Sequence, residues 1–268
     1  METSISRFFS ELLEPWISRF VYDFVGSQEY VKGIVRRCLW IEDAEVADAL
    51  ASKFIAARLE GVRKMRLESD AASTRAFAER PHRFKQIQGR SVKSAIVVPK
   101  VTSEERPYLP VGLLSSNSIV SDNAFALYDA PLWNMALIAS RVHLVWIATV
   151  CGKLETRYRY SNTLGWNTFP VPSLTEKNKA DLVRCAEDIL LAREAHFPAT
   201  IAELYDAETM PPDLRAAHDR NDETLERIYI GRRFRNDTER LEKLFELYTK
   251  MANDKAPQKP VRKARLDG

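Results

Sequence analysis

The spacing of apolar residues changes character at residue 173 of this 268-residue chain. Before that point, three short β-rich stretches are separated by Pro, Ser and Asn, which is typical of strands joined by turns (residues 94–101, 111–114 and 124–128). After it, apolar side chains recur at helical spacing. The sequence therefore predicts an α+β protein, in which a mixed α/β domain is followed by a small all-α helical bundle.

The helical part carries its own start signals. Ser173 with Glu176, and Asn236 with Glu239, have the spacing of capping boxes, and Pro211 and Pro212 suit the first turn of a further helix. The prolines at 170 and 172 are the natural joint, and the last residues are rich in Pro, Lys and Arg. We expect three parts: a domain over 1–172, the helical bundle over 173–252, and a disordered basic tail over 253–268.

The first 150 residues predict further elements. We expect a short helix followed by a strand in residues 5–25, a buried strand at 36–41, and an Ala-rich helix over 44–77 that Asp43 caps. Residues 131–150 are almost all apolar and predict a central buried helix, straight or kinked. His143 lies within that run, and we interpret it as a core histidine rather than a metal ligand.

Charge is distributed unevenly, although the formal net charge is only +3. Residues 80–159 hold eleven Lys or Arg against five Asp or Glu, whereas residues 173–250 hold thirteen against seventeen. A basic middle and an acidic C-terminal part indicate different partners, and the middle is the part suited to phosphate groups.

The three cysteines, Cys38, Cys151 and Cys185, have no metal-binding or redox spacing, so we expect reduced thiols of an intracellular protein. No apolar run approaches the ~18 residues that a membrane span needs. The N-terminus lacks a basic segment followed by an apolar one. These features predict a soluble cytoplasmic protein without a membrane partner.

Catalytic motifs are missing from the sequence. It contains no GxGxxG, GxxxxGK[ST], GxSxG or HExxH, and its four histidines have no metal-ligand spacing. We therefore predict no catalytic residue, no metal and no cofactor in this chain, and favour a binding module. A free-standing enzyme with an unrecognised site is the alternative.

The densest group of polar and aromatic side chains lies in the stretch GKLETRYRYS at residues 152–161. In an extended strand Glu155, Arg157 and Arg159 share one face, and Leu154, Tyr158 and Tyr160 share the other. A carboxylate accepts a hydrogen bond from the cytosine amino group, and a guanidinium binds guanine through two donors. The spacing is compatible with a base reader, and also with an ordinary surface ion pair, which is the commoner arrangement.

Several blocks of sequence, in order, resemble one family. They are FVGSQEYVKG at 24–33, RCLWI at 37–41, VPKVTSEER at 98–106, YLPVGLLS at 108–115, IVSD at 119–122, LYD at 204–206, MPP at 210–212 and FELY at 245–248. Together they resemble the target-recognition and C-terminal parts of MmeI-type restriction–modification enzymes. Those enzymes join a nuclease, an adenine-N6 methyltransferase and a DNA-reading domain in one chain.

The resemblance implies a role for particular residues. Glu155 and Arg157 match paired positions that change with target specificity, and Arg159 and Asn123 match two further base-reading positions. The family's Gly-rich S-adenosylmethionine loop and its Asn-Pro-Pro-Tyr motif are absent from this sequence. The resemblance therefore implies a double-stranded DNA recognition module whose methyltransferase domain, present in cis or as a separate subunit, binds S-adenosylmethionine.

Basic residues near these positions are candidates for phosphate contacts, which position the duplex without specifying its sequence. They are Lys100, Arg106, Lys153, Arg63 and Lys64. A solvated helix face is the alternative interpretation of the cluster around Arg63. For the whole chain, the alternative function is a protein–protein module that recruits a separate methyltransferase subunit.

Overall fold

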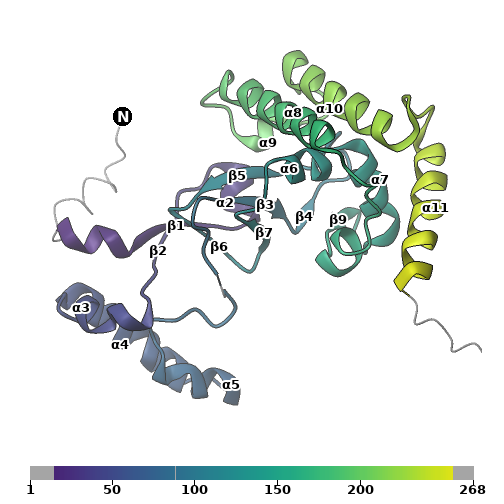
Figure 1. Cartoon of the computed structure of the whole chain (residues 1–268). Coiled ribbons are helices and arrows are strands. Elements are labelled where there is room, and N and C mark those ends of the chain that lie inside the picture. Colours follow the sequence, from purple (N-terminus) through teal and green to yellow (C-terminus); the bar gives the residue numbers. More distant parts are fainter. Residues whose placement is uncertain (1–14, 88, 256–268) are drawn as a thin grey trace, which may run out of the picture.

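The structure, a computed structural model, describes residues 15–87 and 89–255 (Figure 1). Its strands form three small sheets with the orders β2-β1-β6, β5-β3-β7 and β4-β9-β8. Helices α8 to α11 follow the last strand, so the expected α+β class, with a recognition part followed by a helical part, is confirmed.

The first sheet has β1 (Val21–Val25) at its centre, between antiparallel β2 (Arg37–Leu39) and parallel β6 (Ser118–Val120). A 3-10 helix, η1 (Pro15–Phe20), precedes β1 as the sequence predicted; the residues before Pro15 lie outside the described part. The expectation of a buried strand at 36–41 was wrong. That strand is an edge strand with Arg37 exposed, because no other strand of the described residues pairs with its outer side.

The second sheet contains the three predicted strands. β3 (Ser94–Pro99) lies between β5 (Gly112–Ser115) and β7 (Ala124–Tyr128), antiparallel to both. Residues 95–99 are buried on both faces, so this central strand reads as a continuous apolar run rather than an alternating one. Just beyond Pro99 the chain passes through Lys100 into β4 (Val101–Thr102) of the third sheet.

The expected helix over 44–77 is divided into several pieces. They are η2 (Asp43–Glu45), α3 (Val46–Leu50), α4 (Lys53–Leu67), α5 (Ala72–Arg75) and η3 (Ala76–Glu79). Ser52 interrupts the run, because its hydroxyl caps α4 by accepting from the Ile55 amide at 3.4 Å. Asp43 is not the cap that we expected; its carboxylate accepts from His82 and Arg83. Figure 1 shows these helices projecting from the sheets, away from α8 and α10.

The apolar run at 131–150 forms two buried helices, α6 (Trp133–Ile138) and α7 (Arg141–Val150), which confirms a kinked element. The Ser140 hydroxyl starts the second helix by accepting from the His143 amide at 3.1 Å. His143 is fully buried, and its Nε2 lies 3.0 Å from the Tyr160 hydroxyl. Burial lowers the pKa of His143 to about 3, so it is a neutral core residue, as predicted.

As far as Lys255, where the described part ends, the C-terminal part contains four helices: α8 (Glu176–Glu194), α9 (Ile201–Leu204), α10 (Pro212–Ile230) and α11 (Asp237–Lys255). The first capping box is formed by Thr175 and Asn178, and not by Ser173 with Glu176. The last helix continues through Lys255, so residues 253–255 are helical and not part of a tail. Residues 256–268 lie outside the described part. None of the described helices is long and apolar enough to cross a bilayer.

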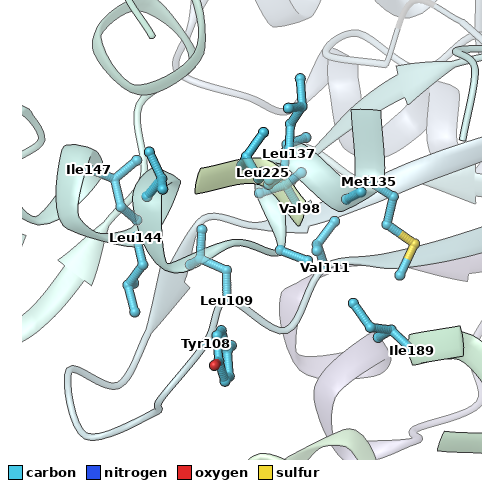
Figure 2. Packing of buried hydrophobic residues seen from close by; sticks show 14 of the residues in the cluster. Val98, Tyr108, Leu109, Val111, Met135, Leu137, Leu144, Ile147, Ile189 and Leu225 are labelled. Carbon is cyan, nitrogen blue, oxygen red and sulfur yellow. The ribbon is translucent and has the colours of Figure 1, made fainter. Parts of the chain in front are cut away.

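One core joins the two parts of the chain. Val98 and Leu109 of the recognition part belong to the same buried cluster as Ile189 of α8 and Leu225 of α10, as Figure 2 shows. The last helix also packs back onto the recognition part, because Phe245 and Tyr248 lie against Trp146 of α7. The helical part is therefore fixed to the recognition part rather than attached by a linker alone.

Two buried polar groups reinforce this joint. The Arg193 guanidinium of α8 donates to the Val111 carbonyl at 2.7 Å and to the hydroxyls of Tyr205 and Tyr30, the latter on α2 (Ser27–Lys32). Asp222 of α10 accepts from the Arg141 amide at 2.7 Å and from the Tyr108 hydroxyl at 3.0 Å. Polar groups that are buried in this way fix a single arrangement, because leaving any of them unpaired is costly.

Candidate nucleic-acid interface

The stretch at 152–161 forms an exposed β-hairpin. Strand β8 (Lys153–Leu154) pairs antiparallel with β9 (Arg157–Arg159), and the partners Leu154 and Arg157 leave a two-residue turn between them. Tyr160, just after β9, is buried and packs near Phe125 and His143, whereas Arg157 and Arg159 are exposed. The predicted alternation holds at β9, where both arginines face solvent and the half-buried Tyr158 packs against the core. It was wrong for Leu154, which we expected on the face of the tyrosines and which is exposed.

Glu155 lies in the turn and not in a strand. Its φ of 57° is in the left-handed region, so the expectation that it continues the extended face of Arg157 and Arg159 was wrong. The turn nevertheless brings its Oε2 to 2.5 Å from an Arg157 guanidinium nitrogen. Both side chains are open to solvent, at 75% exposure for Glu155 and 46% for Arg157. The pair therefore presents a carboxylate and a guanidinium together at the tip of the hairpin.

A second carboxylate lies beside the same turn. Glu104, in the turn after β4, is hydrogen-bonded through its side chain to Thr156, the other residue of the hairpin turn. The pKa of Glu104 is lowered by this hydrogen bond, with the cations of Lys153 and Arg157 contributing. The hairpin tip is thus a compact group of two carboxylates and two cations, which sequence spacing did not indicate.

Lys100 connects the hairpin to the central sheet. Its carbonyl accepts from the Tyr160 amide at 2.8 Å, next to the β4–β9 pairing of Val101 with Arg159. Its ammonium lies 4.8 Å from the centre of the Phe125 ring and donates to the Asp122 carbonyl. The side chain that we predicted to contact phosphate is engaged within the fold in the free chain.

Asn123 lies in the loop between β6 and β7, one residue beyond the carbonyl that binds Lys100. Its amide donates to the Ser121 hydroxyl at 3.3 Å, and the residue is exposed. The Asn123 loop, residues 121–123, is therefore held beside the hairpin through Lys100. Three of the four predicted base-reading residues share the hairpin, and the fourth lies in this adjoining loop.

Arg159 has a free guanidinium. It makes no hydrogen bond or ion pair through its side chain with residues 15–87 or 89–255, although its amide pairs with the Gly152 carbonyl at 3.0 Å. Lys153 is also exposed, with its ammonium 5.9 Å from the centre of the Tyr158 ring. Both cations can reach a ligand without breaking an ion pair.

The other predicted phosphate contacts lie apart from the hairpin. Arg63 and Lys64 are exposed on α4, where their only described ion pairs are long, at 3.9 Å to Glu60 and 4.0 Å to Glu68. Arg66, one turn further along, is different, because its guanidinium binds three backbone carbonyls of residues 77–83. On this helix, Arg63 and Lys64 are therefore exposed and only weakly paired, whereas Arg66 holds the neighbouring loop.

Arg106 points toward the helical part. It is only partly exposed, and burial lowers its pKa, while the charge of Asp206 opposes this shift. One guanidinium nitrogen is buried without a hydrogen-bond partner in the described structure. Arg106 therefore lies at the joint between the two parts, and a phosphate contact would compete with this placement.

The described residues show no cluster of three His, Cys, Asp or Glu side chains arranged to hold a metal ion. A cavity of about 310 Å³ lies beside β2 and α4. Its wall combines the apolar Phe54 and Leu59 with the cations Arg37, Arg58 and Arg66. S-adenosylmethionine carries a sulfonium cation, so this cavity does not fit it.

Comparisons with known proteins assign both parts of the chain to one family. Residues 9–173 match the family described as "MmeI, target recognition domain", and residues 174–255 match "MmeI, C-terminal domain". The chain is 36% identical over 237 residues to DNA methyltransferase A of Bacillus subtilis (strain 168), covering 88% of this chain and 27% of that protein. It matches the structure of the Type IIL restriction–modification enzyme MmeI in complex with DNA with a TM-score of 0.84 and 32% identity, covering 94% of this chain and 33% of that one.

The fold and its exposed hairpin define a target-recognition domain joined to a helical C-terminal domain. The chain belongs to the MmeI family. It spans about a third or less of the length of these two relatives.

Ser27 is a residue of this interface that the sequence did not single out. It lies within the family-like block at 24–33, yet its contacts are to Asn123 and Lys100, which are 96 and 73 residues away along the chain. Only the fold brings these segments together.

Proposed function

We propose that this chain is the sequence-specific double-stranded DNA recognition module of an adenine-N6 DNA methyltransferase in a restriction–modification system. The single observation that carries the proposal is the exposed hairpin tip, where Glu155 and Arg157 are paired and Arg159 is free, next to the loop of Asn123. These four side chains read base edges. The structure of the related enzyme MmeI was determined in complex with DNA, which supports a duplex as the ligand of this chain.

A carboxylate and a guanidinium recognise different bases. The Arg157 guanidinium suits guanine O6 and N7, and the Glu155 carboxylate suits the cytosine amino group, each good contact being worth about 1–3 kcal/mol of discrimination. In the free chain each of these groups neutralises the other across 2.5 Å. Binding to bases exchanges an exposed ion pair, which is itself worth about 0–1 kcal/mol, for specific hydrogen bonds.

Phosphate contacts come from cations that are exposed. Lys153 lies in strand β8 of the hairpin, and Arg63 and Lys64 lie on α4, away from the helical part (Figure 1). Lys100 and Arg106 are further candidates for phosphate contacts. In the free chain the Lys100 ammonium binds the Asp122 carbonyl and the Arg106 guanidinium is partly buried, so both must move to reach a phosphate. Such contacts set the register of the duplex and supply affinity that falls as salt rises.

Catalysis belongs to another part of the enzyme. The methyltransferase domain, in cis or as a separate subunit, binds S-adenosylmethionine and takes the target adenine out of the base stack. We propose that the boundary between the recognition and helical parts lies at Pro170 and Pro172. The helical part supports the recognition part through their shared hydrophobic core. The chain alone transfers no methyl group.

A titration of a 20-base-pair random duplex across salt concentrations tests DNA binding. We expect the logarithm of the affinity to fall linearly with the logarithm of salt concentration, by about 0.9 for each phosphate contacted. An affinity that is undetectable at low salt refutes the proposal. Co-purification with a methyltransferase polypeptide, without such binding, supports a protein–protein docking module instead.

Two further measurements complete the test. Methylome sequencing of cells that carry the complete enzyme returns the target sequence and the modified base, and a modified base other than adenine contradicts the adenine assignment. Methyl transfer from labelled S-adenosylmethionine to DNA by this chain alone contradicts the division of labour proposed above.

A further inference from the structure

The Ser27 hydroxyl bridges two backbone groups of the candidate interface. It accepts from the Lys100 amide at 3.0 Å and donates to the Asn123 carbonyl. A serine hydroxyl has one proton and two lone pairs, so these two roles are compatible. The bridge joins segments that follow different strands, since Lys100 comes after β3 and Asn123 comes after β6.

The same serine is connected to the hairpin by one further step. The Lys100 residue whose amide binds Ser27 uses its carbonyl to accept from Tyr160, which directly follows β9. A continuous path of hydrogen bonds therefore runs from the Asn123 loop, through Ser27 and Lys100, to the strand that carries Arg157 and Arg159.

The backbone around Ser27 is packed closely against that loop. The Ser121 amide donates to the Val25 carbonyl at 2.8 Å. A Cβ added at Gly26 would lie 2.5 Å from the Ser121 hydroxyl oxygen and 3.5 Å from the Asn123 Cβ. Glycine at this position lets the start of α2 approach the Asn123 loop closely, so that the next residue can form the bridge.

Helix α2 does not need the Ser27 hydroxyl for its own start. The helix begins at Ser27 with Gly26 as its N-cap. The Gly26 amide, which has no partner within the helix backbone, donates to the Glu29 carboxylate at 3.1 Å. Within the described structure, both hydrogen bonds of the hydroxyl go to the Asn123 loop and to Lys100. Removing it therefore disturbs the interface before it disturbs the helix.

We propose that Ser27 is a positioning residue for DNA recognition, which fixes the Asn123 loop and the Arg157 hairpin at the spacing that lets both read one duplex. This inference rests on the proposed function, because it assumes that both segments contact bases. Ser27 itself contacts no base. Without the bridge, the two segments vary in relative position and each loses some of its contribution to discrimination.

Two variants isolate the hydroxyl. Ser27→Ala removes it, and Ser27→Thr restores it. Thr175→Ala is the matched control, because it removes a capping hydroxyl of α8 in the helical part whose hydrogen bonds are to Asn178 and not to the hairpin or the Asn123 loop. The probe is a pool of duplexes with 20 random base pairs, selected by the whole chain and sequenced after selection. Selections with Asn123→Ala and Arg157→Ala identify the base pairs that each segment reads.

We expect Ser27→Ala to lower discrimination at both sets of base pairs by roughly three- to tenfold, the scale of one or two lost hydrogen bonds. Affinity for the unselected pool and its salt slope stay unchanged. Ser27→Thr restores discrimination, and Thr175→Ala leaves it intact. A uniform loss of affinity for all sequences, or unchanged discrimination, overturns the inference.

Hydrogen exchange of the free chain measures the bridge without DNA. In Ser27→Ala the Lys100 amide exchanges faster by roughly threefold or more, because it loses its acceptor. Unchanged protection of that amide overturns the bridge even if the chain binds DNA specifically. If the wild-type chain enriches no sequence from the pool, the proposed function fails first, and the two failures are thereby distinguished.

Discussion

The Tyr160 amide donates a 2.8 Å hydrogen bond to the Lys100 carbonyl, at the point where the central sheet passes into the hairpin sheet. The Lys100 ammonium is turned inward from there, toward Phe125 and the Asp122 carbonyl. A phosphate contact by Lys100 therefore requires its ammonium to leave that carbonyl. The exposed guanidiniums of Arg157 and Arg159 face no such competition from the backbone.

Arg157→Ala tests base reading. We expect the variant to lose about 1–3 kcal/mol of discrimination at one base pair, because a bidentate contact is removed. The free chain should lose no more than about 1 kcal/mol of stability, since the partner in the fold is the exposed Glu155. Binding of the selected target and of its single-base-pair variants measures the first effect, and denaturant unfolding measures the second.

The matched control is Arg220→Ala. Arg220 forms a similarly exposed ion pair with Asp188, at 3.5 Å, within the helical part. This variant should leave the preference at every base pair unchanged. If Arg157→Ala weakens binding to all duplexes alike, Arg157 contacts phosphate rather than a base.

Arg63→Ala and Lys64→Ala test phosphate contacts on α4. Each residue is exposed, with an ion pair of 3.9 Å or longer that is weak in water. Each substitution should weaken binding to every duplex and reduce the salt slope by about 0.9, because one fewer counterion is released. Titrations at several salt concentrations measure both quantities. An unchanged salt slope would mean that Arg63 and Lys64 belong to a solvated helix face and contact no phosphate. The control is Lys177→Ala on α8, which should change neither the affinity nor the slope.

The spacing of apolar and polar residues along the sequence predicted most of the helices and strands. The features that it did not predict depend on contacts between residues distant in sequence. The alternation of Arg157, Tyr158 and Arg159 predicted which side chains face solvent, because it requires only an extended backbone. It failed at Glu155, since no Gly or Asn marks the turn there.

The same limit applies to individual basic residues. Arg63 and Arg66 lie one turn apart on a helix, yet only Arg66 meets the carbonyls of residues 77–83. Arg106 resembled a surface cation until the fold placed it near Asp206, a hundred residues further along the chain. Sequence spacing carries no information about contacts of this kind.

Arg193→Met tests whether the two parts unfold together. The substitution leaves the Val111 carbonyl and the hydroxyls of Tyr30 and Tyr205 without their shared donor inside the joint. We expect a loss of about 3 kcal/mol or more in the free energy of unfolding, because the unpaired groups remain buried. Denaturant unfolding measures it, and the wild-type chain should unfold in a single transition.

The control for this prediction is Arg184→Met on the same helix, where the side chain is 70% exposed. It should change stability by less than about 0.5 kcal/mol. Two separate transitions in the wild-type chain would contradict the single shared core.

Asp222 gives the joint a dependence on pH. Burial raises the pKa of Asp222 from its ordinary 3.8 to about 7, with the Glu226 carboxylate adding to the effect, while the Arg141 amide, the Tyr108 hydroxyl and the Arg240 cation oppose it. Between about pH 4 and pH 7 the unfolded chain releases this proton and the folded chain retains it. The contribution of Asp222 to stability is therefore greatest at low pH, declines as pH rises, and is constant above about pH 7.

Asp222→Asn removes that titration. Its amide oxygen can still accept from the Arg141 amide, and the Tyr108 hydroxyl retains Asp219 as an acceptor at 3.1 Å. Relative to the variant, the wild-type chain should lose up to about 4 kcal/mol of stability between pH 4 and pH 7, since each pKa unit corresponds to about 1.4 kcal/mol. Denaturant unfolding of both proteins at each pH measures the difference, with Asp219→Asn as the exposed control. Parallel pH profiles for wild type and Asp222→Asn would mean that Asp222 ionises in the fold near its ordinary pKa, and that the joint does not respond to pH through this residue.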